Sequence, residues 1–408
     1  MKQMGSIPPW FLSDDGVLRI GGHSAEVLVA QAGDTPLFVY DLARVRAKID
    51  AFRLSMPSEV GLHYAIKANP YEPLLRFIAN VVDGLDVASG GELQRALACG
   101  GTAAHISMAG PGKRDDELEA AIAAGATVNL ESEGEAARAL RIADRLGLAP
   151  RLAVRVNPDF EIKGSGMRMG GGAKPFGVDA ERVPALVRML LGAGADWQGF
   201  HIFAGSQALD GEAIIAAQRS TLDLSARLAE EAGAAPPLVN LGGGFGIPYF
   251  PGEQPLDLAP IGAALGEALA ARGDVLRDSR FAIELGRWLV GDAGVYLTRI
   301  VDRKVSHGEI FVIVDGGLHH QLAASGNFGT VVRRNYPLAL AHRLGASAEE
   351  EVSVVGCLCT PLDRLGDRVG LPRSEVGDLV AIFMAGAYGA SASPQAFLGH
   401  PPAREMTV

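Results

Sequence analysis

The sequence predicts a (β/α)8 barrel joined to a β domain, and two patterns lead to this fold class. Between residues 36 and 290, eight short apolar runs alternate with longer helical patterns. After residue 291, β-branched runs follow one another without long helices between them. Repeated strand and helix units of this length are typical of a closed barrel of parallel strands rather than of an open doubly wound sheet. A chain of 408 residues is also longer than one hydrophobic core usually supports.

The predicted elements follow from apolar runs of strand length and from apolar residues at helical spacing. The barrel strands are expected at Leu62 to Ile66, Leu85 to Ala88, His105 to Ala109, Thr127 to Glu131, Leu152 to Val156, Gly199 to Phe203, Leu238 to Leu241 and Phe281 to Leu285. Helices are expected between them, at Gly91 to Ala98, Asp115 to Ala124, Glu133 to Leu146, Arg182 to Leu191 and Glu212 to Glu231.

The β domain is expected to hold strands at Val295 to Val305, Ile310 to Val314, Val352 to Cys359 and Leu379 to Met384. A short strand at Val17 to Ile20 is expected to pair with this sheet. The predicted domains are therefore a barrel of residues 36–290 and a discontinuous β domain of residues 1–35 and 291–408.

Charge and composition exclude several classes of partner. The formal net charge of −10 lacks the basic surface that nucleic acid or anionic lipid requires. The first ten residues carry no apolar signal region, and no run approaches the ~18 apolar residues of a membrane span. We therefore expect a cytoplasmic protein. Only three cysteines occur, Cys99, Cys357 and Cys359, so a disulfide framework is not expected.

Polar residues gather where the predicted barrel strands end, which is where barrels carry their chemistry. They are Lys67 and Asn69, Asp86 and Ser89, Glu131, Arg155 and Asn157, His201, Phe203 and Ser206, Gly242 to Gly244, and Glu284 with Arg287. The carboxyl-terminal mouth of the barrel is therefore the predicted active site. Arg155 is the better candidate for a cofactor contact, whereas Asp86 is equally consistent with an ion pair.

Three of these features have both a structural and a chemical interpretation. Lys67 could extend its amine to solvent, or it could form a Schiff base with an aldehyde. Gly242 to Gly244 could be a tight turn or an anion-binding nest, and the run lacks the spacing of a dinucleotide fingerprint. Glu284 and Arg287 could be a surface ion pair, or they could serve a pyridine nitrogen and a phosphate.

A metal site is not expected from the histidines. His319 and His320 are adjacent, so on a strand they would point apart, and no His-x-x-x-His spacing occurs. His400 and the remaining histidines stand in no motif and are interpreted as surface or core residues.

Together these motifs resemble the fold type III pyridoxal phosphate (PLP) decarboxylases, the family of diaminopimelate, ornithine and arginine decarboxylases, over nearly the whole chain. The resemblance implies an alanine racemase-like architecture with PLP bound to Lys67, which stands in Tyr64-Ala65-Ile66-Lys67-Ala68-Asn69. It further implies cofactor contacts from Arg155, Phe203, Ser206, Gly242, Gly243, Gly244, Glu284, Gly286, Arg287 and Tyr388. Thr360 and Tyr388 are implied to contact the substrate, and Cys359 matches a catalytic cysteine that the partner subunit supplies.

Within this family the chain is most similar to a subgroup associated with exosortase systems, which resembles decarboxylases of carrier-linked substrates. Ala109 to Arg114 and Gly316 to His320 support this placement. Two departures stand out. Phe203 replaces the family's ring-stacking histidine, and Thr360 replaces the acid that binds the distal ammonium of a diamino acid.

The implied function is α-decarboxylation of an L-amino acid or its derivative, including an aminoacyl group linked to a carrier protein, by a homodimer with shared active sites. Lys67 would hold PLP, Glu284 would keep the ring protonated, and Cys359 would return a proton to the α-carbon. The alternatives are a decarboxylase of free meso-diaminopimelate that makes lysine, a racemase, a PLP homeostasis protein and a decayed regulatory protein. Glu284 argues against the racemase, and the segment after residue 291 argues against the homeostasis protein.

Overall fold

The computed structural model describes residues 1–162, 164, 166–168, 170–328 and 333–408, which form two compact units. The barrel unit comprises Ile49–Gly246 and Pro255–Gly286. The β unit comprises Met1–Lys48, Ile247–Gln254 and Arg287–Val408. The predicted boundaries at residues 36 and 290 differ from this division, because residues 36–48, 247–254 and 287–290 belong to the β unit.

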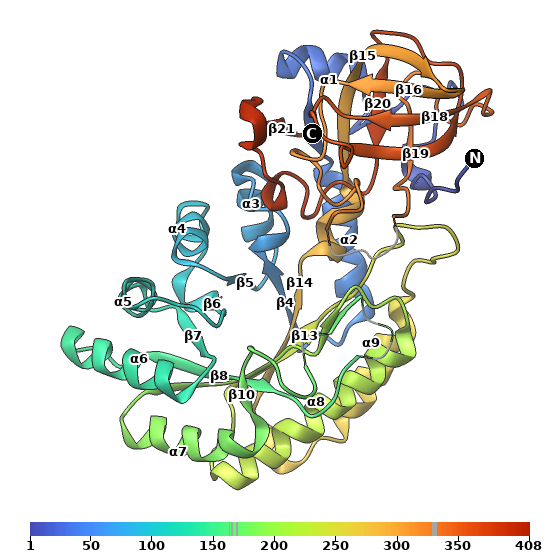
Figure 1. The fold of residues 1–408 in the computed structure, drawn as a ribbon. Helices are drawn as coiled ribbons and strands as arrows, with labels where there is room; N and C mark the ends of the chain where they lie inside the picture. The colour runs from blue at the N-terminus through green and yellow to red at the C-terminus, as the bar shows by residue number, and fades with distance from the viewer. Residues whose placement is uncertain (163, 165, 169, 329–332) are drawn as a thin grey trace. The chain divides into compact units, whose positions relative to one another are not determined.

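The barrel unit is a closed ring of eight parallel strands (Figure 1). They are β4 (Val60–Ala65), β5 (Gly84–Val87), β6 (Ile106–Met108), β7 (Thr127–Leu130), β8 (Arg151–Asn157), β11 (Asp196–Ile202), β13 (Leu238–Gly243) and β14 (Arg280–Leu285). Each strand pairs with the next in this order, and β14 pairs with β4 to close the ring. The eight predicted strands are these eight, so the fold class is confirmed.

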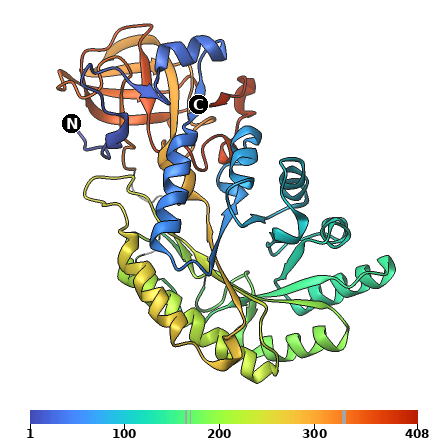
Figure 2. The same ribbon diagram turned by 180° about the vertical axis from the view of Figure 1, so that it is seen from behind.

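Helices lie outside the strands of the barrel unit, and α8 and α9 lie side by side (Figure 2). They are α3 (Glu72–Ala79), α4 (Gly90–Ala98), α5 (Asp115–Ala124), α6 (Glu133–Leu146), α7 (Val183–Gly192), α8 (Gly211–Ala232) and α9 (Leu258–Ala270). Helix α2 (Leu42–Ser55) leads from the β unit into the barrel unit. Three short strands lie outside the ring. Strand β10 (Val178–Asp179) pairs with β8, and β9 (Met167–Arg168) pairs with β12 (Gly205–Ser206).

Local sequence explains why these helices begin and end where they do. The hydroxyls of Ser89 and Ser132 accept backbone N–H groups at the first turns of α4 and α6. Gly125, Gly147 and Gly233 follow α5, α6 and α8 in the left-handed conformation. The predicted bounds of α5 and α6 agree with the structure for this reason.

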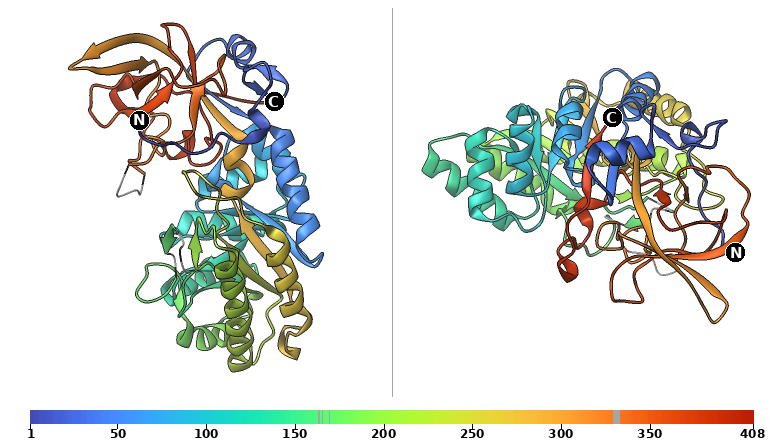
Figure 3. Two further views of the ribbon diagram at one scale, coloured as in Figure 1. Left: turned by 90° about the vertical axis from the view of Figure 1, so that its right-hand side faces the viewer. Right: turned by 90° about the horizontal axis from the view of Figure 1, so that it is seen from above.

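The β unit is built around a mostly antiparallel sheet of eight strands. They are β3 (Leu37–Tyr40), β15 (Gly294–Ser306), β16 (Glu309–Val314), β17 (Leu338–Leu340), β18 (Glu350–Val355), β19 (Arg364–Leu371), β20 (Leu379–Ile382) and β21 (Arg404–Thr407). The first half of β15 pairs with β3 and β20, and its second half pairs with β16. Strands β15 and β16 form an antiparallel hairpin. The tip of this hairpin, drawn in orange, projects from the sheet (Figure 3).

Three expectations for the β unit are wrong. The early segment forms β1 (Arg19–Ile20), which pairs with β2 (His23–Ser24) before α1 (Ala25–Ala32), and β3 joins the large sheet instead. Strand β18 ends at Val355, so Cys357 and Cys359 lie on a loop and not on the strand predicted to run to Cys359. His319 and His320 lie in a turn, and their ring centroids are only 3.7 Å apart.

Within the described part of the chain, no helix is long and apolar enough to cross a lipid bilayer.

Candidate active site

Lys67 lies just beyond the end of β4, in the 3-10 turn Ile66–Ala68. The sequence predicted Lys67 at the end of a strand that runs to Ile66. In the structure the strand ends at Ala65, and Lys67 is the second residue of the turn that follows. Its side chain is 47% exposed, and its Nζ atom lies 3.9 Å from Oε1 of Glu284. The same nitrogen is 5.6 Å from the ring centroid of Phe203. The carboxyl-terminal mouth of the barrel therefore presents a primary amine beside a carboxylate and an aromatic ring.

Glu284 is held on β14 by a buried histidine. Its Oε2 atom lies 2.9 Å from Nε2 of His201, and both side chains are almost completely buried. Burial raises the pKa of Glu284, but the hydrogen bond from His201 and the charge of Lys67 outweigh it, and the pKa falls to about 2. Glu284 is therefore ionised at neutral pH.

His201 is the residue that sequence reasoning missed. Its place on the predicted strand that ends at Phe203 gave it no role, because the family resemblance assigns ring stacking to Phe203. His201 lies on β11, which is not a neighbour of β14 in the ring. A signal was present, since a polar residue two positions before Phe203 on an alternating strand points to the same side. Its partner could not be read from the sequence.

The glycine run after β13 is required by close packing. Added β-carbons at Gly243 and Gly244 would overlap the carbonyl oxygens of Glu284 and Gly205. Gly242 and Gly244 have φ values of 70° and 76°, which favour glycine. The N–H of Gly242 donates to Oδ1 of Asn240 at 2.9 Å, so this amide is already used inside the loop.

Gly286 directly follows β14, and Ser206 lies beyond the end of β11. A β-carbon at Gly286 would lie 2.9 Å from that of Ala68, so glycine lets the end of β14 approach the turn of Lys67. Ser206 lies on β12, opposite Met167 of β9.

Arg155 belongs to a buried network of charges. Its Nη1 atom donates to Oε1 of Glu131 at 2.9 Å, and its guanidinium lies 5.1 Å from the ring centroid of Phe176. Glu131 also accepts the N–H groups of Gly110 and Gly177, each at 2.7 Å. The cofactor contact predicted for Arg155 would therefore come from a guanidinium that Glu131 holds in place.

Asp86 is an ion-pair member, which was one of its two interpretations. Its Oδ2 atom lies 3.7 Å from Nδ1 of His63, and its Oδ1 atom accepts the hydroxyl of Ser107. Burial lowers the pKa of His63, but Asp86 and other carboxylates together raise it by more. The net shift of the pKa is therefore upward.

Arg287 and Tyr388 form a cluster within the β unit. Nη1 of Arg287 donates to the hydroxyl of Tyr249 at 2.9 Å, and its guanidinium lies 4.7 Å from the ring centroid of Tyr388. Tyr388 has a φ of 55°, an uncommon conformation for a residue with a side chain. Such strain is often found at functional sites.

The loop after β18 carries Cys359 and Thr360. Cys359 is exposed, and Thr360 is half-buried with its hydroxyl accepting the N–H of Leu362 at 3.3 Å. Asp363 ends the loop, and its carboxylate accepts the N–H groups of Leu318 at 2.6 Å and Leu358 at 2.9 Å. Cys359 and Thr360 thus stand on a backbone that Asp363 braces.

The barrel mouth fits an aldehyde-bearing, protonated pyridine ring. Lys67 supplies an accessible amine, and Glu284 supplies a buried carboxylate whose charge can hold a proton on a ring nitrogen. Phe203 supplies a flat face near that amine. The donor set of the barrel unit is thus the one that pyridoxal phosphate needs.

Comparison with known proteins agrees with this site. Residues 42–291 match the family described as "Pyridoxal-dependent decarboxylase, pyridoxal binding domain". The chain therefore belongs to the pyridoxal-dependent decarboxylases of the diaminopimelate and ornithine decarboxylase family. It is a carboxy-lyase that uses pyridoxal 5'-phosphate, acting on an amino acid or an amino-acid derivative, so the predicted enzyme class and cofactor are confirmed.

Two curated relatives and one solved structure indicate the range of the family. The chain is 36% identical to the L-glutamyl-[BtrI acyl-carrier protein] decarboxylase of Niallia circulans over 379 residues, covering 91% of this chain and 88% of the relative. It is 33% identical to diaminopimelate decarboxylase of Archaeoglobus fulgidus over 404 residues, covering 98% and 93%. The crystal structure of diaminopimelate decarboxylase from M. jannaschii with L-lysine is similar with a TM-score of 0.87 at 28% identity, covering 97% and 92%.

Proposed function

We propose that this enzyme decarboxylates an L-amino acid whose distal end is neutral, and that an aminoacyl group on a carrier protein is the leading substrate class. The observation that carries the proposal is Thr360, which stands where the family resemblance implies an acid for the distal ammonium of a diamino acid. A hydroxyl cannot offset the charge of a buried ammonium as a carboxylate can. The similarity to a decarboxylase of a carrier-bound glutamyl group supports this choice.

Asp363 is the nearby acid that could have replaced the missing carboxylate. Its side chain is buried, and both of its oxygens accept backbone N–H groups. Burial raises its pKa, and the hydrogen bonds from Leu318 and Leu358 only partly oppose this. The arrangement supports a role for Asp363 in holding the loop rather than in binding a substrate ammonium.

The proposal gives each predicted site residue a role in binding the cofactor. Lys67 would bind the cofactor through its amine, while Glu284, oriented by His201, would hold a proton at the ring nitrogen. Phe203 and Arg155 would orient the ring, and the glycine run with Ser206, Gly286, Arg287 and Tyr388 would bind the phosphate side. When bound, pyridoxal phosphate supplies a ring that accepts the electron pair left as the α-carboxylate departs as carbon dioxide.

Cys359 would then donate its thiol proton to the α-carbon. A thiol carries a proton that it can transfer, which is what a general acid must supply. Because the family resemblance implies that this cysteine comes from a partner subunit, we propose a homodimer with shared active sites. A cytoplasmic location remains part of the same proposal.

Steady-state kinetics on a panel of substrates tests the substrate class. The panel contains diaminopimelate, ornithine, lysine and an L-glutamyl thioester of pantetheine. We expect kcat/KM for the neutral-tailed thioester to exceed that for the diamino acids by roughly ten- to a hundredfold, since an unpaired buried polar group costs about 1–3 kcal/mol. A higher kcat/KM for diaminopimelate would instead identify the enzyme as a decarboxylase of the free diamino acid.

Thr360→Glu provides the matched variant. We expect it to lower kcat/KM for the thioester and raise it for diamino acids, because it restores the carboxylate. Thr360→Ser keeps a neutral hydroxyl and should retain the preference of the natural chain. An unchanged preference in Thr360→Glu would show that this position does not contact the distal end.

A further inference from the structure

The β unit contains a histidine whose burial calls for an explanation. His319 is 0% exposed. Neither of its ring nitrogens has a hydrogen-bond partner among the residues that the structure describes. A buried polar group without a partner costs about 1–3 kcal/mol. Its neighbour His320 is different, because its ring bonds to the hydroxyl of Tyr296 at 3.1 Å and to the carbonyl of Pro401 at 2.9 Å.

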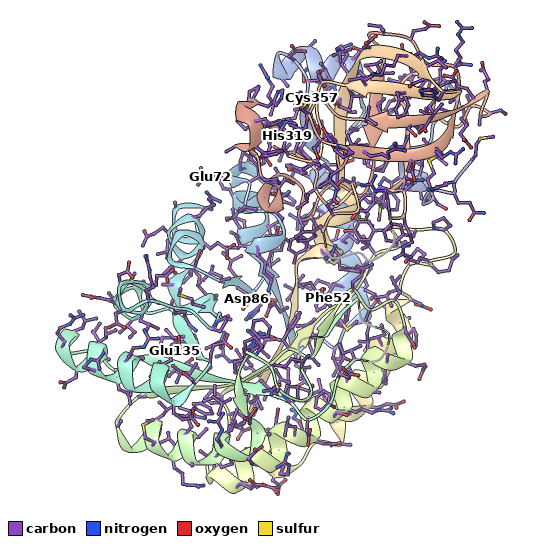
Figure 4. The ribbon with its side chains drawn as sticks, in the orientation of Figure 1. Phe52, Glu72, Asp86, Glu135, His319 and Cys357 are labelled. Carbon is purple, nitrogen blue, oxygen red and sulfur yellow. The ribbon has the colours of Figure 1, made fainter. Side chains whose placement is uncertain are left out.

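Two other potential ligands lie beside His319. One atom each from His319, Cys357 and His400 can be chosen so that all three lie within 4.8 Å of one another. The Sγ atom of Cys357 is 3.8 Å from Nδ1 and 3.9 Å from Nε2 of His400, and the rings of His319 and His400 have centroids 5.3 Å apart. The side chains of His319 and Cys357 lie in the same region of the β unit in Figure 4.

The three segments that carry these residues are fixed next to the potential ligands. Asp363 accepts the N–H of Leu318, which precedes His319, and the N–H of Leu358, which follows Cys357. His320 bonds to the carbonyl of Pro401, which follows His400.

Two glycines make room for the carboxylate at the centre of this arrangement. Added β-carbons at Gly317 and Gly356 would overlap the carboxylate of Asp363. Supporting bonds of this kind orient the ligands of metal sites and keep them in place.

We propose that His319, Cys357 and His400 bind a divalent transition-metal ion of the zinc class. One thiolate and two imidazoles are donors that zinc prefers, with Zn–S distances of about 2.3 Å and Zn–N distances of about 2.0–2.1 Å. The observed separations need to close by about an ångström to meet this geometry. Cys357 and His400, whose side chains would move, are only half-buried. Binding releases the thiol proton of Cys357 to solvent, and the fourth position stays open to water.

The consequence of such an ion would be local order in the β unit. Cys357 is two residues from Cys359 and three from Thr360 on the same loop. An ion on Cys357 would tie this loop to the turn of His319 and to the segment of His400. The inference does not depend on the proposed substrate, since metal binding is measured directly.

Zinc analysis of the purified holoenzyme tests the site. The protein is treated with a chelator, given one equivalent of zinc sulfate and desalted, and its zinc content is then measured by mass spectrometry. We expect one zinc per chain, with an X-ray absorption spectrum that fits one sulfur at about 2.3 Å and two nitrogens at about 2.0–2.1 Å. Zinc should also raise the thermal unfolding midpoint, because it binds the folded state.

Cys357→Ser and His400→Gln are the test variants, and Cys359→Ser is the control on the same loop. We expect zinc content and the rise in unfolding midpoint to fall strongly in both test variants and to stay unchanged in the control. Far-UV circular dichroism checks that each variant is folded, and either test variant suffices if the other does not fold. Equal zinc content in the folded test variant and the natural chain, or substoichiometric zinc in the natural chain, would overturn the proposal.

Discussion

Glu284 keeps its negative charge although its side chain is almost completely buried. Burial by itself raises the pKa of this carboxylate, since it disfavours the charged form. The hydrogen bond from His201 and the amine of Lys67 reverse that preference. The electronic role proposed for Glu284 therefore depends on the hydrogen bond from His201.

Glu284→Gln tests this role. We expect the variant to retain the cofactor but to lose roughly 10²–10³-fold in kcat, the usual cost of removing a preorganised electrostatic contact. Single-turnover kinetics and the visible absorbance of the bound cofactor measure the two effects separately. Glu267→Gln, on the exposed face of α9, is the control and should leave both unchanged. A natural rate in Glu284→Gln would leave this carboxylate with only a structural role.

Phe203 is expected to contribute affinity rather than acid–base chemistry. Phe203→Ala should weaken cofactor binding by roughly 0.5–1.5 kcal/mol beyond the loss of buried area, which is the range for aromatic contacts. Titration of the apoenzyme with pyridoxal phosphate measures the change. Phe203→His restores a flat ring and should recover most of the affinity. If Phe203→Ala binds the cofactor as tightly as the natural chain does, the ring points away from it.

At the scale of elements, buried charges connect three strand-to-helix loops of the barrel. Nζ of Lys113 lies 2.8 Å from Oε1 of Glu135 on α6, and both side chains are almost fully buried. Oε2 of Glu135 accepts the N–H of Glu131, which in turn holds Arg155. The mouth of the barrel is therefore braced by a continuous polar network around the residue predicted to contact the cofactor.

Lys113→Met tests the strength of this network. Removing the cation leaves two carboxylates buried, so we expect the free energy of unfolding to fall by about 3–5 kcal/mol. Arg145→Met is the matched control, because it breaks an ion pair with Glu119 whose two side chains are largely exposed. That change should cost less than about 1 kcal/mol. Urea unfolding measures the free energy of unfolding of both variants. Equal decreases in the two variants would contradict the stabilising role of the buried network around Lys113.

At the scale of the whole molecule, the proposed dimer has a direct test. Lys67→Ala and Cys359→Ala should each be inactive alone. When they are coexpressed, random pairing should return roughly a quarter of the natural activity, because each mixed dimer with shared sites contains one intact site. The control pairs Lys67→Ala with the double variant, which forms no intact site and should stay inactive. Recovery that does not exceed this control would show that Cys359 and Lys67 serve the same subunit.

Much of the molecule was predictable because it depends on local sequence. Apolar runs of strand length and apolar residues at helical spacing are short-range features, and they predicted the barrel strands and the bounds of α5 and α6. Lys67 and Glu284 were also predictable, since parallel barrel strands bring their carboxyl ends to one mouth.

The tertiary structure decided the contacts between residues that are distant in sequence. Alternation along the chain suggested that Cys359 lies on a strand and that His319 and His320 point apart. Instead Asp363 accepts the N–H of Leu358 within its own loop and the N–H of Leu318, which is 45 residues away. Likewise, His201 meets Glu284 across an intervening strand, and His400 meets Cys357 although 43 residues separate them in the sequence. Spacing in a sequence determines which side chains share a face, whereas long-range packing alone determines which faces meet.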